Sequence, residues 1–366
     1  MEYFEIKEKV KPSSGAVRPS DFSLSEGKPV EPELVLRNGN VSLYCLDFAN
    51  RSALFVETPP DRDLLKDPFL YVAQYDAATH VVKVPFETLC RLSSRVAIDS
   101  SQLIFIYSVG RCGSTLVSRI FHETDGVESL SEPDVFTQII GEWGTTALID
   151  SEKADLLRAC TLLQCAPGQS RSAARWVLKF RSMVAALGPM FHACFPDSMS
   201  IFLYRRPVPW MKSMQRVVRV GDPTERAPVS EYRKLFGRAI PILDLEGSVS
   251  FLEVAASLWT SCMASAEAMQ RSGIPLFVAL YEELNTSPQQ VLCEMFSHCD
   301  LTTSSVRNLD RILTEDSQAG SKLSRASAAE TGVNLSMAHI QELERLIRNY
   351  LPGFTSETIL ANTIMP

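Results

Sequence analysis

Short apolar runs followed by longer amphipathic stretches dominate the chain from about residue 100 onward. The runs occupy residues 103–107, 176–180, 199–204 and 276–280, a length that suits buried strands better than helices. The stretches between them, of which 251–271 is the longest, are typical of helices. This alternation predicts βαβ units, and therefore an α/β fold with a mostly parallel sheet and helices on both faces.

The first 98 residues follow another pattern. Residues 11–38 are rich in Pro, Ser, Gly and charge, so we expect an extended or poorly ordered lead-in there. Four strand-like runs follow, at 41–48, 52–58, 69–75 and 80–86, and predict a small antiparallel β-meander. We therefore expect an N-terminal β-rich unit over 1–98, with no assigned role, and a second unit over 99–366. Near the end of the chain, Ser336 is a predicted N-cap of a helix that stops before Pro352.

The first predicted strand of the second unit leads directly into a loop at residues 108–115 and then a helix. Gly110 and Gly113 permit positive φ and a close approach of the backbone to a ligand. The unpaired N–H groups of the following helical turn favour an anion, and Arg111 adds a fixed positive charge. The loop is not a Walker A motif, because Ser108 and Ser114 stand where that motif requires Gly and Lys. A turn without a ligand and an unusual P-loop kinase remain alternatives for these residues.

The same loop resembles the 5′-phosphosulfate-binding loop of sulfotransferases that use PAPS (3′-phosphoadenosine-5′-phosphosulfate). Arg111, Gly113, Ser114 and Thr115 match that family's pattern, and Cys112 stands where Ser is more common. The resemblance extends over about residues 100–300. It implies a P-loop-type α/β fold, transfer of a sulfuryl group to a hydroxyl or amine, PAPS as co-substrate and PAP as product, with no metal.

Three further segments resemble parts of that family. Arg205 and Ser213, on either side of Pro207, resemble its 3′-phosphate site, whereas the alternative is a pair of solvated arginines at a strand end. Tyr281, in a segment like the family's Y-E-D-L passage, would lie against the adenine or pack in the core. A C-terminal basic loop usually closes the cofactor site in this family, and Lys322 and Arg325 are its candidates here. Around Lys179 the match is partial, because Arg181-Ser182 replaces the usual Pro.

An acceptor hydroxyl must also lose a proton, and the acidic or basic residues after the loop are the candidates: His122, Glu123, Glu132 and Asp134. His122 is expected at the far end of the first helix, more than about 10 Å from the phosphates at 1.5 Å per residue. Tyrosylprotein sulfotransferases and some bacterial relatives use a Glu at a similar separation from the loop. This resemblance favours Glu132 as the base, with Arg111 stabilising the leaving group, while a solvated turn residue is the alternative reading of Glu132.

Composition narrows the partners. A net charge of −7 argues against a general nucleic-acid binder. Nine cysteines, an odd number without a C-x-x-C pair, indicate reduced thiols rather than a disulfide framework or a zinc site. Neither a signal-peptide pattern nor a membrane-length apolar run is visible, so we expect a cytoplasmic protein. The expected partner is a small-molecule or peptide acceptor, and a PAP-binding pseudoenzyme or interaction protein is the alternative function. The pattern predicts no oligomeric state.

Overall fold

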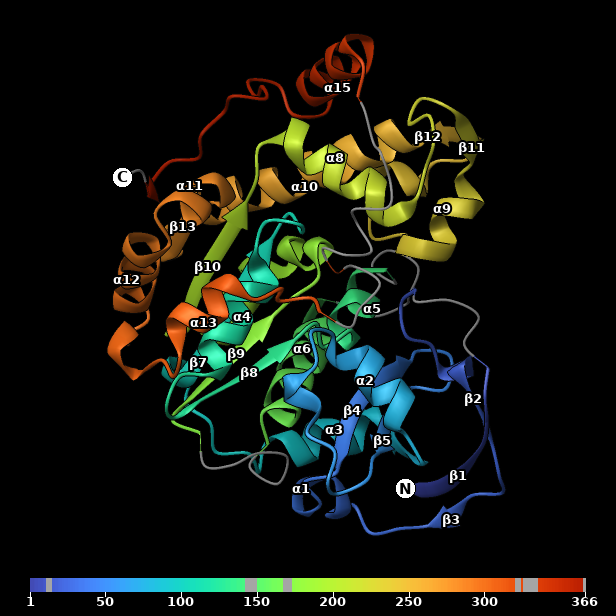
Figure 1. The fold of residues 1–366 in the computed structure, drawn as a ribbon. Coiled ribbons are helices and arrows are strands. Elements are labelled where there is room, and N and C mark those ends of the chain that lie inside the picture. Colours follow the sequence, from blue (N-terminus) through green and yellow to red (C-terminus); the bar gives the residue numbers. More distant parts are fainter. Residues whose placement is uncertain (11–14, 142–149, 167–172, 320–323, 325–334, 365–366) are drawn as a thin grey trace.

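A six-stranded parallel sheet forms the centre of the larger part of the molecule (Figure 1). The computed structural model describes residues 1–10, 15–141, 150–166, 173–319, 324 and 335–364. The strands of this sheet lie in the order β14-β13-β10-β7-β9-β8, and every neighbouring pair is parallel. Their bounds are β7 (Leu103–Ser108), β8 (Val127–Ser131), β9 (Arg175–Lys179), β10 (Met199–Tyr204), β13 (Leu276–Leu280) and β14 (Thr363–Ile364). The four predicted strands are confirmed as β7, β9, β10 and β13, and the sequence reading missed β8 and β14.

Helices flank this sheet, which confirms the predicted fold class. They include α4 (Ser114–His122), α5 (Val135–Gly141), α6 (Asp150–Gln164), α7 (Gly188–Cys194), α8 (Pro207–Val218), α10 (Phe251–Arg271), α11 (Tyr281–Thr286), α12 (Pro288–His298), α13 (Leu309–Thr314) and α15 (Met337–Tyr350). Local signals set several of the ends. The side chain of Ser336 accepts from the backbone N–H of His339 at 3.2 Å, so the predicted N-cap of α15 is confirmed. Pro207 opens α8, where its missing N–H has no intrahelical acceptor to lose.

The N-terminal residues form a separate antiparallel sheet in the order β2-β1-β6-β5-β4, with β3 paired to β1. Its strands are β1 (Glu2–Lys9), β2 (Phe22–Leu24), β3 (Lys28–Pro29), β4 (Val41–Asp47), β5 (Ser52–Glu57) and β6 (His80–Pro85). The predicted meander is therefore confirmed for β4, β5 and β6. The described part of the lead-in holds more regular structure than its composition indicated, because β2, β3, η1 (Pro19–Asp21) and α1 (Leu34–Arg37) lie in it.

The predicted strand at 69–75 is wrong. These residues form α2 (Leu70–Ala77), which follows the short helix η2 (Leu64–Lys66). The buried positions 70, 71, 73 and 74 have helical spacing rather than strand alternation. The buried side-chain amide of Gln74 donates to the Ser42 hydroxyl at 2.8 Å and to the Leu43 carbonyl at 2.9 Å, so this polar group is satisfied only when the helix packs on β4. Tertiary packing therefore overrides the aromatic and β-branched character of the segment.

The two sheets share one hydrophobic core. Val41, Leu43 and Phe55 of the N-terminal sheet belong to the same buried cluster as Phe105 and Phe180 of the parallel-sheet layer. Figure 1 shows the N-terminal sheet below the parallel sheet, with α8, α10 and α15 at the opposite end. The remaining elements are α3 (Phe86–Ser93), α9 (Val229–Phe236), the two-stranded sheet of β11 (Arg226–Pro228) and β12 (Ser248–Ser250), and the short helices η3 (Ser100–Gln102), η5 (Ser182–Leu187), η6 (Pro241–Asp244) and η7 (Thr303–Ser305). Within the described ranges, none of the helices combines the length and apolar character needed to cross a membrane.

Candidate functional site

The sheet order brings the predicted site residues to one crevice. The chain leaves β7 towards β8 and β9 on one side and leaves β10 towards β13 on the other, although β7 and β10 are neighbours. Leu203 of β10 pairs with Ser108 of β7, and Tyr204 pairs with Leu280 of β13, so the three strands end at the same level. Ligands of open α/β sheets bind where the connections diverge in this way. The loop after β7, Arg205 and Tyr281 all begin there.

The loop after β7 has an unusual backbone. Gly110, Arg111 and Gly113 have φ values of 74°, 51° and 80°, and Gly113 is the N-cap of α4. A Cβ on Gly113 would stand 3.1 Å from Leu284 and 3.3 Å from Tyr281, so a side chain would be both strained and crowded. Arg111 holds a left-handed conformation that is uncommon for non-glycine residues. The loop is thus built to turn the backbone sharply around the N-terminus of α4.

Buried contacts fix the loop from behind. The indole N–H of Trp210, a fully buried residue of α8, donates to the carbonyls of Val109 and Gly110 at 3.0 Å each. The thiol of Cys112 faces the sheet and donates to the Leu203 carbonyl at 3.3 Å, and burial raises its pKa to about 11. Cys112 can therefore offer a ligand its main chain but not its side chain. Nothing in the sequence motif indicated that Trp210, from α8, holds the loop.

Two arginines meet at the mouth of the loop. The Arg111 Nε–H donates to the Ser213 hydroxyl at 3.1 Å, and an Arg205 N–H donates to the Arg111 carbonyl at 3.3 Å. Burial and the neighbouring Arg205 charge lower the pKa of Arg111. The Arg205 guanidinium also lies 4.4 Å from the centre of the Tyr281 ring. The structure thus brings four predicted residues, Arg111, Arg205, Ser213 and Tyr281, into one cluster.

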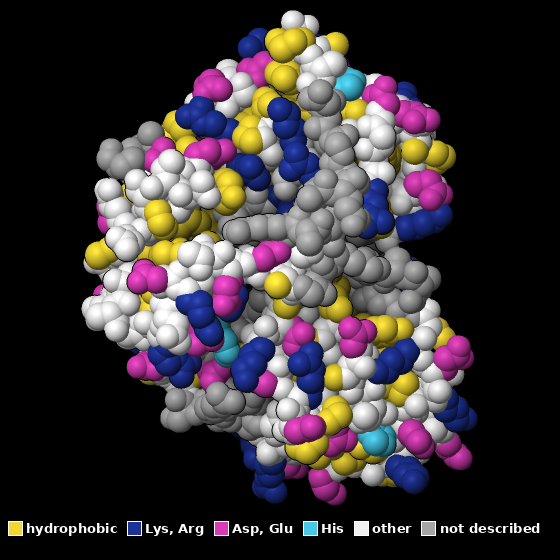
Figure 2. All heavy atoms as spheres, viewed as in Figure 1, with side chains coloured by type: hydrophobic (Ala, Val, Ile, Leu, Met, Phe, Trp, Pro, Cys, Tyr) yellow, Lys and Arg dark blue, Asp and Glu magenta, His cyan; other side chains and the backbone are white. Residues whose placement is uncertain are grey.

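This cluster holds more positive charge than its acidic neighbours compensate. The Glu282 carboxylate is 3.9 Å from Arg205 Nε, beyond hydrogen-bonding distance. Among the described residues, Arg205 Nε is buried without a hydrogen-bond acceptor, and both oxygens of its ion-pair partner Glu282 are buried without a donor. Arg111 donates to the neutral side chains of Ser213 and Gln318, so the two guanidiniums share one nearby carboxylate in the described part of the chain, an imbalance that a bound anion would relieve. Figure 2 shows Lys and Arg side chains gathered over the part of the face where α8 lies in Figure 1.

A residue outside the sequence prediction occupies the front of the loop. The Gln318 side-chain oxygen accepts from Arg111 at 2.7 Å, and its amide N–H₂ lies 3.4 Å from the Thr115 hydroxyl. Gln318 therefore contacts a guanidinium and a hydroxyl that were both predicted to bind phosphate. Lys322 and Arg325, the predicted closing residues, lie outside the described part of the chain. Nothing in the sequence motif pointed to Gln318, because its contacts span more than two hundred positions.

Glu132 lies at the carboxyl end of β8 and forms an ion pair with Lys179 at the end of β9. The Glu132 N–H also donates to the Lys179 carbonyl at 2.7 Å, and Glu132 has a φ of 59°. Their side chains are 15% and 3% exposed, so the pair is largely shielded from water. Two strained non-glycine residues, Arg111 and Glu132, thus belong to the candidate site. The alternative reading of Glu132 as a solvated turn residue does not fit this burial.

The other base candidates occupy different environments. The Asp134 side chain is fully buried, and its oxygens accept from Arg181 at 2.9 Å and from the Val17 N–H at 2.8 Å, which indicates a structural role. Glu123 lies 3.6 Å from Arg307. His122 is at the C-terminal end of α4 and lines a cavity beside that helix. Ser114 and Thr115 are buried in the first turn of α4, beside the loop. In the described part of the chain, no group of three or more His, Cys, Asp or Glu residues could hold a metal ion.

Comparison with known proteins gives matches of fold. No family model matches the sequence, and no curated protein does. The chain is similar to solved sulfotransferases: STF9 from Mycobacterium avium, at 13% identity over 72% of this chain and 79% of that one (TM-score 0.44), and a sulfotransferase from Alicyclobacillus acidocaldarius, at 12% identity over 70% and 94% (TM-score 0.41). The sulfotransferase domain of the Synechococcus PCC 7002 olefin synthase is 13% identical over 69% of this chain and 95% of its own (TM-score 0.40). The roles of individual residues rest on the geometry of the site instead.

Proposed function

We propose that the protein is a sulfotransferase that moves a sulfuryl group from PAPS to a hydroxyl or amine of an acceptor and releases PAP. The observation that carries this proposal is the pair of guanidiniums, Arg111 and Arg205, held together at the crevice between β7 and β10. Their charge, together with the unsatisfied Arg205 Nε, fits a ligand with more than one anionic group. A nucleotide phosphorylated at both the 5′ and 3′ positions has that character.

The described side chains fit such a nucleotide. Arg111, the N–H groups of the first turn of α4 and the hydroxyls of Ser114 and Thr115 would bind the 5′-phosphosulfate. Arg205 and Ser213 would bind the 3′-phosphate, since the Ser213 hydroxyl accepts from Arg111 and keeps its own proton to donate. The Tyr281 ring, which begins α11 beside Arg205, would contact the nucleoside.

The Glu132–Lys179 pair fits the need for a base that removes the proton of the acceptor hydroxyl. In transfer, the acceptor oxygen forms a bond to sulfur while the bond from sulfur to the bridging phosphate oxygen breaks, and PAP leaves with that electron pair. Glu132 would take the proton of the acceptor hydroxyl. Protonation neutralises the carboxylate beside Lys179, so the positive charge of this buried ammonium becomes available to the sulfuryl oxygens. Arg111 would stabilise the leaving phosphate in the same way.

The proposal is tested first by binding and then by transfer. Calorimetry should give a dissociation constant for PAP below about 100 μM, equivalent to about 5.5 kcal/mol, without added magnesium, and clearly weaker binding of 5′-AMP. The protein should then move ³⁵S from labelled PAPS to an acceptor in the presence of EDTA. Absence of PAP binding contradicts the proposal. PAP binding without transfer to any acceptor supports the pseudoenzyme alternative, and magnesium-dependent phosphorylation by ATP supports a kinase.

A further inference from the structure

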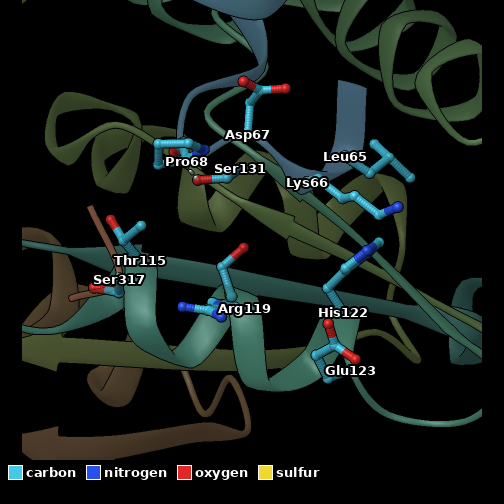
Figure 3. A pocket seen from close by; sticks show the side chains of 11 residues that line it. Leu65, Lys66, Asp67, Pro68, Thr115, Arg119, His122, Glu123, Ser131 and Ser317 are labelled. Atoms are coloured by element: carbon cyan, nitrogen blue, oxygen red, sulfur yellow. Dashed lines mark hydrogen bonds between the residues drawn. The ribbon is translucent and has the colours of Figure 1, made fainter. Parts of the chain in front are cut away.

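A cavity of about 230 Å³ runs along α4, between this helix and the N-terminal unit. Figure 3 shows Thr115, Arg119 and His122 on the α4 side and residues 65–68 of the N-terminal segment across from them. Ser131, the last residue of β8, and Ser317 complete the lining. The cavity is smaller than the range of about 300–1,000 Å³ common for sites that bind drug-sized ligands. It therefore fits a small molecule or one unit of a larger one.

One end of this cavity coincides with the proposed transfer site. Thr115 belongs to the anion-binding turn, and Ser131 immediately precedes Glu132 in the chain. His122 lines the cavity two helical turns further along α4. A molecule in the cavity therefore has one end beside the loop and the strand end that carries the proposed base. This is the arrangement that an acceptor requires.

The N-terminal wall of the cavity is fixed to the strand ends that carry Glu132 and Lys179. The Ser131 hydroxyl donates to the Pro68 carbonyl at 2.7 Å. The residues that follow Pro68 continue the contact: the Phe69 ring centre lies 6.0 Å from the Lys179 ammonium, and the Tyr71 ring centre lies 5.4 Å from the Arg181 guanidinium. The N-terminal unit is thus part of the construction of the site, and its position determines the width of the cavity.

The lining indicates the chemistry of the ligand. Nine of the eleven lining residues have polar side chains, and Leu65 and Pro68 are the exceptions. Four of the nine are Lys, Arg, Asp or Glu, and each has an ion-pair partner outside the lining: Lys66 with Asp63, Asp67 with Arg62, Arg119 with Glu315 and Glu123 with Arg307. Basic and acidic side chains are likewise interspersed over the lower half of the molecule in Figure 2. The charged side chains therefore need no counter-charge from the ligand. The hydroxyls of Thr115, Ser118 and Ser131 have partners within the protein, and each hydroxyl keeps capacity for a further hydrogen bond.

We propose that this cavity is the acceptor site, and that the N-terminal unit restricts the enzyme to a small neutral acceptor rich in hydroxyl groups, such as a monosaccharide unit. This proposal rests on the proposed sulfotransferase function. A steroid is too large for a cavity of about 230 Å³, and an aromatic acceptor without further hydroxyl groups would leave the remaining hydrogen-bonding capacity of the lining unused. The acceptor hydroxyl would lie beside Thr115. As in the proposed transfer step, its proton goes to Glu132, its oxygen binds the sulfur and PAP leaves.

The test compares two cavity variants with a control from the same unit. Leu65→Trp fills the cavity, Lys66→Ala removes one lining group, and Lys28→Ala changes an exposed lysine on β3 that is outside the lining. Methyl glycosides of glucose, galactose and N-acetylglucosamine are compared with 4-nitrophenol and a hydroxysteroid in the ³⁵S transfer assay. Saturation-transfer NMR with the glycosides and PAP measures binding independently of turnover.

We expect transfer to at least one glycoside. Leu65→Trp should abolish this transfer and the NMR signal, and Lys66→Ala should raise KM by about 2- to 10-fold, the value of one net hydrogen bond. Lys28→Ala should match the unchanged protein, and all three variants should bind PAP normally. Three results would each overturn the acceptor assignment. The first is transfer to the phenol or the steroid but to no glycoside, and the second is glycoside transfer that neither cavity variant changes. The third is normal PAP binding without any NMR signal from the glycosides. If the unchanged protein does not bind PAP, the proposed function is overturned, and the acceptor assignment with it.

Discussion

Replacing Arg205 with alanine tests its proposed contact with the 3′-phosphate separately from the other proposed contacts of the nucleotide. Arg205 is 22% exposed, donates to the Arg111 carbonyl and has a buried Nε–H without an acceptor among the described residues. The neighbouring Arg206 offers a matched control. Its guanidinium pairs with Glu357, and both of these side chains are more exposed than Arg205. The two substitutions remove the same charge from adjacent positions, so a difference between them reports on position rather than on net charge.

The expected loss follows from the contacts. A hydrogen bond to a charged group contributes about 1.5–3 kcal/mol, which corresponds to a roughly 10- to 150-fold change in Kd. Removing Arg205 also leaves the Glu282 carboxylate, 3.9 Å away, without its nearest cation and close to the bound phosphate. This repulsion moves the expectation towards the upper end, about 100-fold for PAP. Arg206→Ala should change the PAP affinity by less than about 5-fold, because an exposed ion pair is worth about 0–1 kcal/mol.

Calorimetry with PAP and with adenosine 5′-phosphosulfate, which lacks the 3′-phosphate, measures both effects. Arg205→Ala should weaken PAP by about 100-fold and adenosine 5′-phosphosulfate by less than about 5-fold, since only PAP loses the charge-assisted bond. Thermal unfolding of both variants should show that the fold is retained. Equal weakening of the two nucleotides would refute the assignment of Arg205 to the 3′-phosphate, as would an equal effect of Arg206→Ala.

Three further predictions follow from the site. Glu132→Gln should lower kcat by at least about 100-fold, the usual contribution of a general base, while calorimetry shows PAP affinity within about 3-fold, and retained turnover would place the base elsewhere. Gln318→Ala frees Arg111 from a 2.7 Å hydrogen bond, so PAP should bind about 2- to 10-fold more tightly, whereas weaker binding would make Gln318 a ligand of the nucleotide. The Cys112 thiol, buried and with a pKa raised to about 11, should resist iodoacetamide at pH 8 in the folded protein and react after unfolding, as mass spectrometry of the labelled peptide would show.

Local patterns carried most of the predicted fold. The apolar runs at 103–107 and 276–280 became β7 and β13, and the amphipathic stretch at 251–271 became α10 with those bounds. These signals are local because burial on both faces of a parallel sheet requires apolar residues in unbroken runs. The strand prediction at 69–75 failed because the aromatic and β-branched residues there have strand propensity, whereas the segment folds as a helix that packs on β4 through the Gln74 amide.

Part of the candidate site could likewise be predicted from local patterns, and part could not. The location of Arg111, Gly113, Arg205 and Tyr281 at one edge of the sheet was predictable. The first two lie in the short loop between β7 and α4, the other two follow β10 and β13 directly, and parallel strands end at the same edge. The ion pair of Glu132 with Lys179 was not predictable, because it depends on β8 lying beside β9 in a register that places Ser131 opposite Lys179. In the sequence, Lys179 stands in a predicted strand and in a partial match to the family's pattern, and neither indicated that it pairs with Glu132.

The sequence by itself was enough to predict the kind of ligand, because a strand, a loop with Gly110, Arg111 and Gly113, and a helix are expected to form an anion site through the backbone N–H groups of a few consecutive residues. Only the tertiary structure decided what surrounds that site. Three segments far apart in the chain contribute to these surroundings. Trp210 holds the loop, Gln318 lies in front of it, and residues 65–68 line the proposed acceptor cavity. Residues 65–68 reach the site because the two sheets share one core. Trp210 and Gln318 come from segments 100 and 207 positions away from the loop residues they contact, and a local pattern does not encode which distant segments folding brings together.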